Sequence, residues 1–168
     1  NFGIIYGMGV YGLAQDAGIS RQEAKEFMEK YFNLYKSIGK YIEDTKSGAR
    51  EKGYVETLFG RVRYIPDINS GVMQVRNAAE RMAINMPIQG TAADIIKLAM
   101  IKIQEEIDKG QIKAKMTLQV HDELVFEVKD QDVPSVSEQV KKIMEGIYKL
   151  RCPIEVHINV GDNWDQAK

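Results

Sequence analysis

The chain has 168 residues, of which 44% are hydrophobic and 28% charged, and its formal net charge is −1. This length is enough for one domain with a buried core, and no apolar run reaches the roughly 20 residues that a membrane-spanning helix needs. The single cysteine, Cys152, excludes an internal disulfide, and with only two histidines a zinc site built from histidine and cysteine is not expected.

The first segments are predicted to be helical. Residues 1–12 are typical of a helix end followed by a glycine-punctuated turn. Phe2 and Tyr6, four residues apart, would share one helix face. Residues 20–23 read Ser-Arg-Gln-Glu, a capping-box pattern that predicts a helix ending near Tyr35.

Two further segments complete the first part of the chain. Apolar residues at helical spacing predict a helix over residues 38–49 that ends near Gly53. Residues 54–65 predict two short strands with Gly60 between the strands. We therefore expect a mainly helical region with one small pair of strands.

Long helices are predicted in the middle of the chain. One helix is expected over residues 72–85, and Pro87, which has no backbone N–H, is expected to break or restart it. The helix that follows has a broad apolar face and ends at Gly110. Arg81 and Asn85, four residues apart, lie on one helix face.

Residues 116–128 carry the most informative pattern. Apolar residues alternate with polar ones on both sides of a polar break, which predicts two half-buried strands and a hairpin turn. The break contains His121, Asp122 and Glu123. Adjacent carboxylates at a turn repel each other unless a cation lies nearby, and carboxylate oxygens suit Mg²⁺. Taken alone, the three residues leave open the alternative of a solvated acidic turn.

The end of the chain predicts a helix over residues 135–150 and a strand over residues 154–160. Two helices would then cover one face of a small antiparallel sheet, with the hairpin tip at its open side. The expected fold class is α+β.

Several motifs together resemble one family. Residues 1–7 read Asn-Phe-Gly-Ile-Ile-Tyr-Gly, residues 81–94 read Arg-Met-Ala-Ile-Asn-Met-Pro-Ile-Gln-Gly-Thr-Ala-Ala-Asp, and residues 118–123 read Leu-Gln-Val-His-Asp-Glu. In this order and at this spacing they resemble the C-terminal part of family A DNA polymerases, of the bacterial DNA polymerase I type. Residues 53–61 and the ending from Gly161 also resemble that family, so the resemblance covers essentially the whole chain.

The resemblance implies a fold and an activity. It implies a partial fingers subdomain over residues 1–66 and a partial palm subdomain over residues 67–168. The implied reaction is template-directed DNA synthesis, in which a nucleotide passes from a dNTP to a primer 3′-hydroxyl by a mechanism that uses two Mg²⁺ ions. The implied partners are primer–template DNA, the dNTP and the remainder of the polymerase chain, in the bacterial cytoplasm and at the nucleoid, with no membrane.

The resemblance also implies roles for single residues. Asp122 matches one of the family's two metal-binding aspartates, Glu123 the adjacent acid, and His121 a contact near the primer end. Phe2 matches an aromatic residue that packs against the incoming sugar, and Tyr6 one that stacks near the templating base. Two core aromatic residues at helical spacing are the alternative for this pair.

The resemblance also implies DNA contacts for polar side chains of the middle helices. Arg81, Asn85 and Gln89 match positions that approach the minor groove near the growing end. In the minor groove, the hydrogen-bond acceptors of the bases look alike for both orientations of an A·T pair. A contact there can therefore test the geometry of a base pair without reading the sequence. Plain helix-surface polarity is the alternative, and Gln89 could also be a turn amide beside Gly90. A local basic stretch can engage phosphates although the net charge is −1; it comprises Arg61, Arg63, Arg76 and Arg81. Scattered, solvated arginines are the alternative for this stretch.

Parts of the family's site are expected upstream of Asn1. These are the second metal-binding aspartate and the arginine and lysine that hold the triphosphate. We therefore expect little or no polymerase activity from the chain alone, and an exposed sheet edge that favours self-association. Two other functions stay open: a non-catalytic module that binds primer–template DNA, and an unrelated Mg²⁺-dependent phosphohydrolase that uses Asp122 and Glu123.

Overall fold

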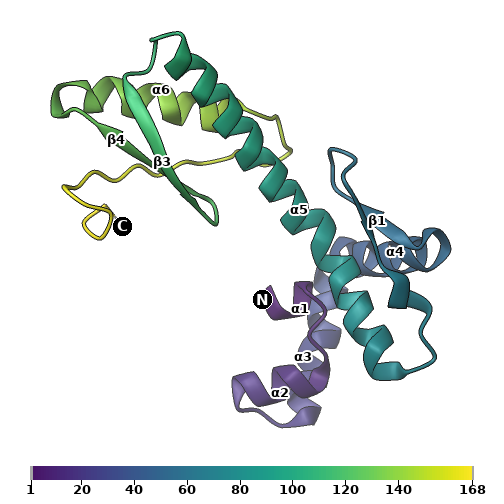
Figure 1. Cartoon of the computed structure of the whole chain (residues 1–168). Helices are drawn as coiled ribbons and strands as arrows, with labels where there is room; N and C mark the ends of the chain where they lie inside the picture. The colour runs from purple at the N-terminus through teal and green to yellow at the C-terminus, as the bar shows by residue number, and fades with distance from the viewer. Residues whose placement is uncertain (1, 168) are drawn as a thin grey trace. The chain divides into compact units, whose positions relative to one another are not determined.

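The computed structural model describes residues 2–167, with the side chain of Phe2 outside the described part. The chain forms two compact units, Asn1–Thr91 and Ala92–Lys168, and the long helix α5 (Met73–Asp108) contributes residues to both (Figure 1). The fold class is α+β, as expected, and the described residues form two separate two-stranded antiparallel sheets. The division into fingers and palm at residues 66 and 67 is a functional one and stays a prediction.

Helices dominate the first unit. They are α1 (Phe2–Ile5), α2 (Val10–Ala17), α3 (Arg21–Leu34) and α4 (Lys36–Lys52), followed by the first part of α5. The capping box at the start of α3 is confirmed. The Glu23 N–H donates to the Ser20 hydroxyl at 3.2 Å, and the Ser20 N–H donates to the Glu23 carboxylate at 2.9 Å. Helix α4 ends where expected, at Gly53, whose φ of 77° places it in the left-handed region.

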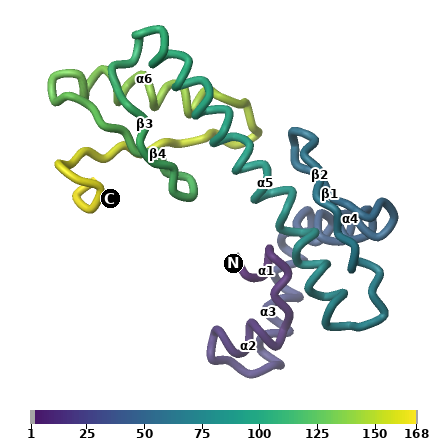
Figure 2. The backbone as a smooth tube through the Cα atoms, in the orientation of Figure 1, coloured from purple at the N-terminus to yellow at the C-terminus, as the bar shows by residue number. Residues whose placement is uncertain are grey.

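The first residues differ from the prediction in two ways. Helix α1 ends at Ile5, so Tyr6 lies in the turn that follows and not on a helix face shared with Phe2. Helix α2, which packs against α3 (Figure 2), is not predicted by the sequence pattern. Glycines in and beside residues 10–17 weaken a helix prediction, because glycine has a low helix propensity.

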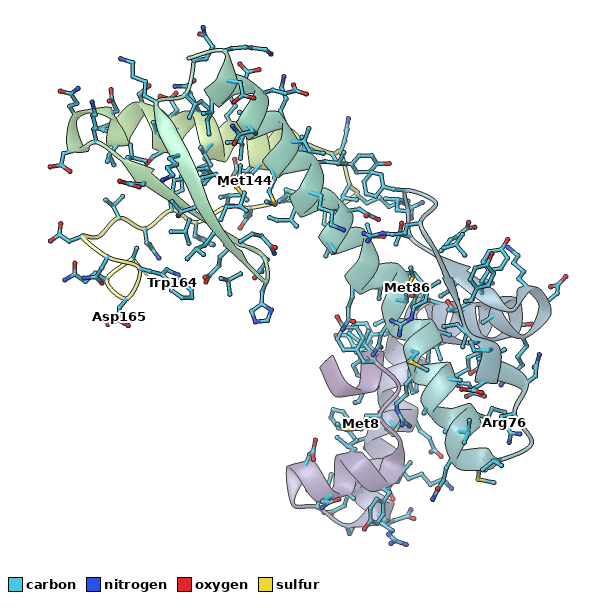
Figure 3. All side chains as sticks on the ribbon, viewed as in Figure 1. Met8, Arg76, Met86, Met144, Trp164 and Asp165 are labelled. Atoms are coloured by element: carbon cyan, nitrogen blue, oxygen red, sulfur yellow. The ribbon has the colours of Figure 1, made fainter. Side chains whose placement is uncertain are left out.

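A small hairpin and a short 3₁₀ helix connect α4 to α5. The strands β1 (Tyr54–Glu56) and β2 (Val62–Tyr64) pair antiparallel, as predicted, and η1 (Pro66–Asn69) follows. Apolar side chains from α4, β1, η1 and α5 form the core of this unit: Ala49, Val55, Ile65, Ile68, Ala79, Ala83 and Met86. Met86 is labelled on α5 in Figure 3. Ion pairs also join α4 to α5, since Glu80 lies 2.6 Å from Arg50 and 3.5 Å from Lys46.

Helix α5 is continuous through Pro87, so the predicted break at this residue is wrong. A proline inside a helix removes one hydrogen bond and crowds the preceding turn. Side chains bond to the carbonyl oxygens around it: the Tyr41 hydroxyl donates to Ile84 at 2.8 Å, and the Thr91 hydroxyl donates to Pro87 itself. These contacts and the buried Met86 offset the cost of the proline.

The second unit is built on a longer hairpin. The strands β3 (Ala114–Val120) and β4 (Glu123–Val128) pair antiparallel, and η2 (Asp130–Asp132) and α6 (Val133–Gly146) follow. Helix α6 begins two residues before the predicted start at residue 135 and ends four residues before the predicted end at residue 150. As predicted, α5 and α6 cover one face of the hairpin (Figure 1), around a core of Ile103, Ile112, Val136 and Val140.

The predicted alternation in β3 is interrupted at Thr117. Met116 lies opposite Phe126, but the next pair is Leu118 with Val125, so Thr117 is an extra residue in this strand. A one-residue bulge moves the following side chains to the other face. Leu118 accordingly lies on the face away from the helices and is 49% exposed. The alternation predicted from residue 116 onward is therefore wrong for the part of β3 that follows Thr117.

Residues 154–160 do not form the strand that was predicted. A strand requires a neighbouring backbone to bond with, and within residues 2–167 the partner of β4 is β3 alone. Residues 155–160 of this segment instead line a groove beside β4. No helix among the described residues is long and apolar enough to cross a membrane.

Candidate functional site

The acidic dipeptide lies at the tip of the β3–β4 hairpin. His121 and Asp122 form the turn, and Val120 pairs with Glu123 to close it. His121 has a φ of 52°, an uncommon left-handed conformation for a residue other than glycine. The side-chain amide of Gln119 donates to the His121 carbonyl oxygen and supports the turn. All three predicted residues, His121, Asp122 and Glu123, are exposed, so this tip presents two adjacent carboxylates to solvent.

A groove of about 1210 Å³ runs from this tip along β4. It is lined by Asp122 and Glu123, by β4, by α6 and by the extended residues 155–161. Figure 3 labels two lining residues, Met144 of α6 and Trp164 of the C-terminal loop. The edge of β4 that does not face β3 is unpaired among the described residues. The groove therefore has the features of a place for one more strand: free backbone groups and apolar walls.

The donor set at the tip suits a hard cation but is small. Carboxylate oxygens are the ligands that Mg²⁺ prefers, and Mg²⁺ is often held by one or two carboxylates together with waters and substrate phosphates. Within residues 2–167, no cluster of three or more histidine, cysteine, aspartate or glutamate side chains could hold a metal ion. The tip itself presents the two exposed carboxylates of Asp122 and Glu123.

The remaining predicted site residues belong to the first unit. Arg81, Asn85 and Gln89 recur every four residues along α5 and so follow one face of this helix. The turn after α1 lies against the same part of α5. A Cβ atom at Gly7 would lie 3.1 Å from Cγ of Arg81 and 3.4 Å from Cδ1 of Ile84. The structure thus brings Tyr6 close to this face of α5.

Asn85 has an unusual environment. Its side chain is half-buried, and its Oδ1 atom is buried with no hydrogen-bond partner in the described part of the protein. A buried polar atom without a partner is costly and needs an explanation. Arg81 and Gln89, on the same face, are exposed. Phe2 also belongs to the predicted site, but its side chain lies outside the described residues.

The basic stretch is partly engaged with the protein itself. Arg61 donates to the Gly90 carbonyl oxygen at 3.3 Å, and Arg76 donates to the Ser70 carbonyl oxygen at 3.2 Å. Arg61, Arg63 and Arg81 are exposed, whereas Arg76, labelled in Figure 3, is half-buried.

Sequence reasoning missed the residues that hold α5 in place near Pro87. The Thr91 hydroxyl accepts a hydrogen bond from the Leu58 N–H at 3.0 Å, which ties the β1–β2 turn to α5. Tyr41 bonds to the same helix from α4. The family motif contains Thr91 and Pro87, but nothing in the local pattern indicates Tyr41, because its bond joins residues 43 positions apart.

The fold and the acidic tip agree with the class of protein that the motifs resemble, a nucleotide polymerase. A family model described as DNA polymerase family A matches residues 1–166. Since this match covers nearly the whole sequence, the chain belongs to DNA polymerase family A.

Similar proteins support this assignment. The thermostable DNA polymerase I of Thermus aquaticus is 48% identical over 168 residues, which are all of this chain and 20% of that protein. DNA polymerase I of Pseudomonas aeruginosa is 47% identical over 167 residues, 99% of this chain and 18% of that protein. A solved structure, the POL domain of Pol1 from M. smegmatis in complex with DNA primer-template and dNTP, matches with a TM-score of 0.94 and 44% identity. The match covers 99% of this chain and 29% of the M. smegmatis chain. The chain spans about a fifth of the length of the curated relatives.

Proposed function

We propose that this chain supplies the C-terminal part of the active site of a template-directed DNA polymerase, acting in the cytoplasm at the bacterial nucleoid. The observation that carries the proposal is the acidic hairpin tip at the end of a groove beside an unpaired strand edge. The M. smegmatis relative, which was solved with primer-template DNA and dNTP, supports the choice of substrates.

The residues of the tip have distinct roles in this proposal. Asp122 is the direct ligand of the metal ions and Glu123 contributes a second carboxylate, while His121 contacts the primer end. Two Mg²⁺ ions, when bound, would neutralise the charge that grows on the attacking and leaving oxygens. Both carboxylates lie on one short turn between paired strands, and a site on such a hydrogen-bonded element is held more precisely than a site on a long loop.

The first unit carries the nucleotide and DNA contacts. Phe2 and Tyr6 border the incoming nucleotide, and Arg81, Asn85 and Gln89 contact the minor groove at the growing end. The buried Oδ1 of Asn85 supports this role, because this atom has no hydrogen-bond partner among the described residues and a bound ligand would supply one. A donor from the bound DNA, or a water between them, would satisfy it.

The groove beside β4 is where the remainder of the polymerase chain would complete the sheet. An inserted strand that carries the second metal-binding aspartate would pair with β4 next to Asp122. Without it, the chain alone is expected to be almost inactive, since single stabilising contacts of this kind are worth roughly 10²–10³ in rate. The unpaired edge also favours self-association of the isolated chain.

Primer extension with Mg²⁺ and four dNTPs tests the proposal. The chain is assayed alone and mixed with the upstream part of the polymerase. Extension in the mixture only is the expected result. Extension by the chain alone would contradict the proposal that this chain supplies only part of the active site. Binding of primer–template DNA by the chain, with no extension in a mixture shown by gel filtration to assemble, would favour the non-catalytic DNA-binding module. Phosphate release from a simple ester, lost in Asp122→Ala, would favour the phosphohydrolase.

A further inference from the structure

A tyrosine hydroxyl fixes the backbone next to Asn85. Tyr41 of α4 donates a hydrogen bond to the carbonyl oxygen of Ile84 in α5, at 2.8 Å and in a partly buried position. That carbonyl belongs to the peptide unit that joins Ile84 to Asn85. The bond therefore holds the backbone at the point from which the Asn85 side chain extends. Pro87 lies two residues further on, where the helix lacks one of its own N–H donors.

The turn that carries Tyr6 contacts the same place. The close approach of Gly7 to Ile84 and Arg81 brings Tyr6 to this part of α5. Burial is the main cause that raises the pKa of the Tyr41 hydroxyl above its ordinary value of 10.0, and the nearby phenol of Tyr6 adds to this rise. A tyrosine hydroxyl is protonated at neutral pH even without this rise, so Tyr41 donates a hydrogen bond to the Ile84 carbonyl oxygen.

The Asn85 amide depends on its backbone for its position. Its Oδ1 has no partner among residues 2–167, so no hydrogen bond to that oxygen orients the amide before a ligand arrives. A small tilt of the Ile84–Asn85 peptide unit would move the amide directly. The bond from Tyr41 opposes such a tilt.

We infer that Tyr41 is a positioning residue for DNA synthesis, which holds Tyr6 and Asn85 in the arrangement that favours a correctly paired primer end. The inference rests on the proposed function. Tyr41 acts through these two residues and is not itself a catalytic residue.

Tyr41→Phe tests the inference in the complete polymerase polypeptide that contains this chain. Removal of the hydroxyl keeps the ring and its packing. The ratio of extension efficiency (kcat/KM) on matched to mismatched primer ends should fall about three- to tenfold, the range that corresponds to one ordinary hydrogen bond. KM for the dNTP should rise while kcat on matched primers changes less than about twofold. Tyr54→Phe is the matched control, because the Tyr54 ring contacts Tyr64 in the β1–β2 hairpin, and it should leave the ratio unchanged.

A second substitution separates positioning from a general structural effect. In an Asn85→Ala background, Tyr41→Phe should change the ratio much less than in the unsubstituted polypeptide, since one of the two residues through which Tyr41 acts has been removed. A full effect in that background would overturn the inference. So would equal losses of kcat and kcat/KM together with a lowered Tm, or an unchanged ratio in Tyr41→Phe. Failure of the unsubstituted polypeptide to extend any primer would instead refute the proposed function, and the inference with it.

Discussion

A side chain at Gly90 on α5 is predicted to destabilise the protein. A Cβ atom at this position would lie 2.6 Å from Cγ2 of Thr57, which is only 4% exposed. Thr57 cannot easily rotate away, because its hydroxyl accepts hydrogen bonds from the Phe59 N–H at 3.3 Å and the Arg61 N–H at 3.2 Å. The Gly90→Ala substitution therefore forces either a backbone shift or the loss of these bonds.

The size of the effect follows from two opposing contributions. Overpacking of this kind costs about 1–3 kcal/mol, whereas alanine is favoured over glycine within a helix by about 1 kcal/mol. We expect Gly90→Ala to lower the free energy of unfolding by about 1 kcal/mol. Gly48 of α4 provides the matched control, since a Cβ there meets no atom within 4 Å. Gly48→Ala should raise the free energy of unfolding by about 0.5–1 kcal/mol.

Urea unfolding of the chain, followed by circular dichroism, measures both variants. Thr57→Ser removes Cγ2 but keeps the hydroxyl, so Gly90→Ala should cost little or nothing in a Thr57→Ser background. The reasoning is refuted if Gly90→Ala stabilises the protein as much as Gly48→Ala does, or if Thr57→Ser does not relieve the loss.

Two further predictions concern the start of α3 and the ion pairs between α4 and α5. Ser20→Ala removes the side-chain half of the capping box and should lower the free energy of unfolding by about 1 kcal/mol, whereas Ser47→Ala, at an exposed position within α4, should change it little; equal effects in urea unfolding would contradict this. Burial tends to raise the pKa of the Glu80 carboxyl, but the hydrogen bonds and charges of Arg50 and Lys46 outweigh it and hold this pKa below 4.5. The stabilisation of the fold by the ionised Glu80 is therefore fully present above about pH 4.5 and is lost as the pH falls through the pKa that Glu80 has in the folded protein. The destabilisation by Glu80→Gln should accordingly be seen near neutral pH and disappear in acid, and a pH-independent difference in unfolding free energy would argue against the ion pairs.

Local sequence patterns predicted those features whose cause is local. The capping box at Ser20 and Glu23 involves residues three positions apart, and both of its hydrogen bonds form. The β3–β4 hairpin was predictable because apolar residues alternate on both sides of a short polar turn. The position of the acidic dipeptide at the tip follows from the same pattern, whereas the roles of the site residues came from the family resemblance and remain proposals.

The features that were missed depend on distant parts of the chain. Helix α5 continues through Pro87 because Tyr41 and Thr91 bond to carbonyls around it, and the spacing within the helix carries no sign of Tyr41. The bulge at Thr117 is defined by pairing with β4, so the alternation within β3 alone could not reveal it. Residues 154–160 alternate as a strand does, but the described part of the chain provides no partner backbone for them.

The most direct test of the central claim is the rate of single-nucleotide incorporation by Asp122→Ala and Glu138→Ala in the assembled polymerase. Glu138 is an exposed carboxylate on α6 that does not line the groove beside β4, and is the control. If Asp122 anchors the metal ions, Asp122→Ala should reduce the rate by at least about 10²–10³-fold, while Glu138→Ala remains close to the unsubstituted rate. Equal rates for Asp122→Ala and Glu138→Ala would contradict the claim that the hairpin tip forms part of the polymerase active site.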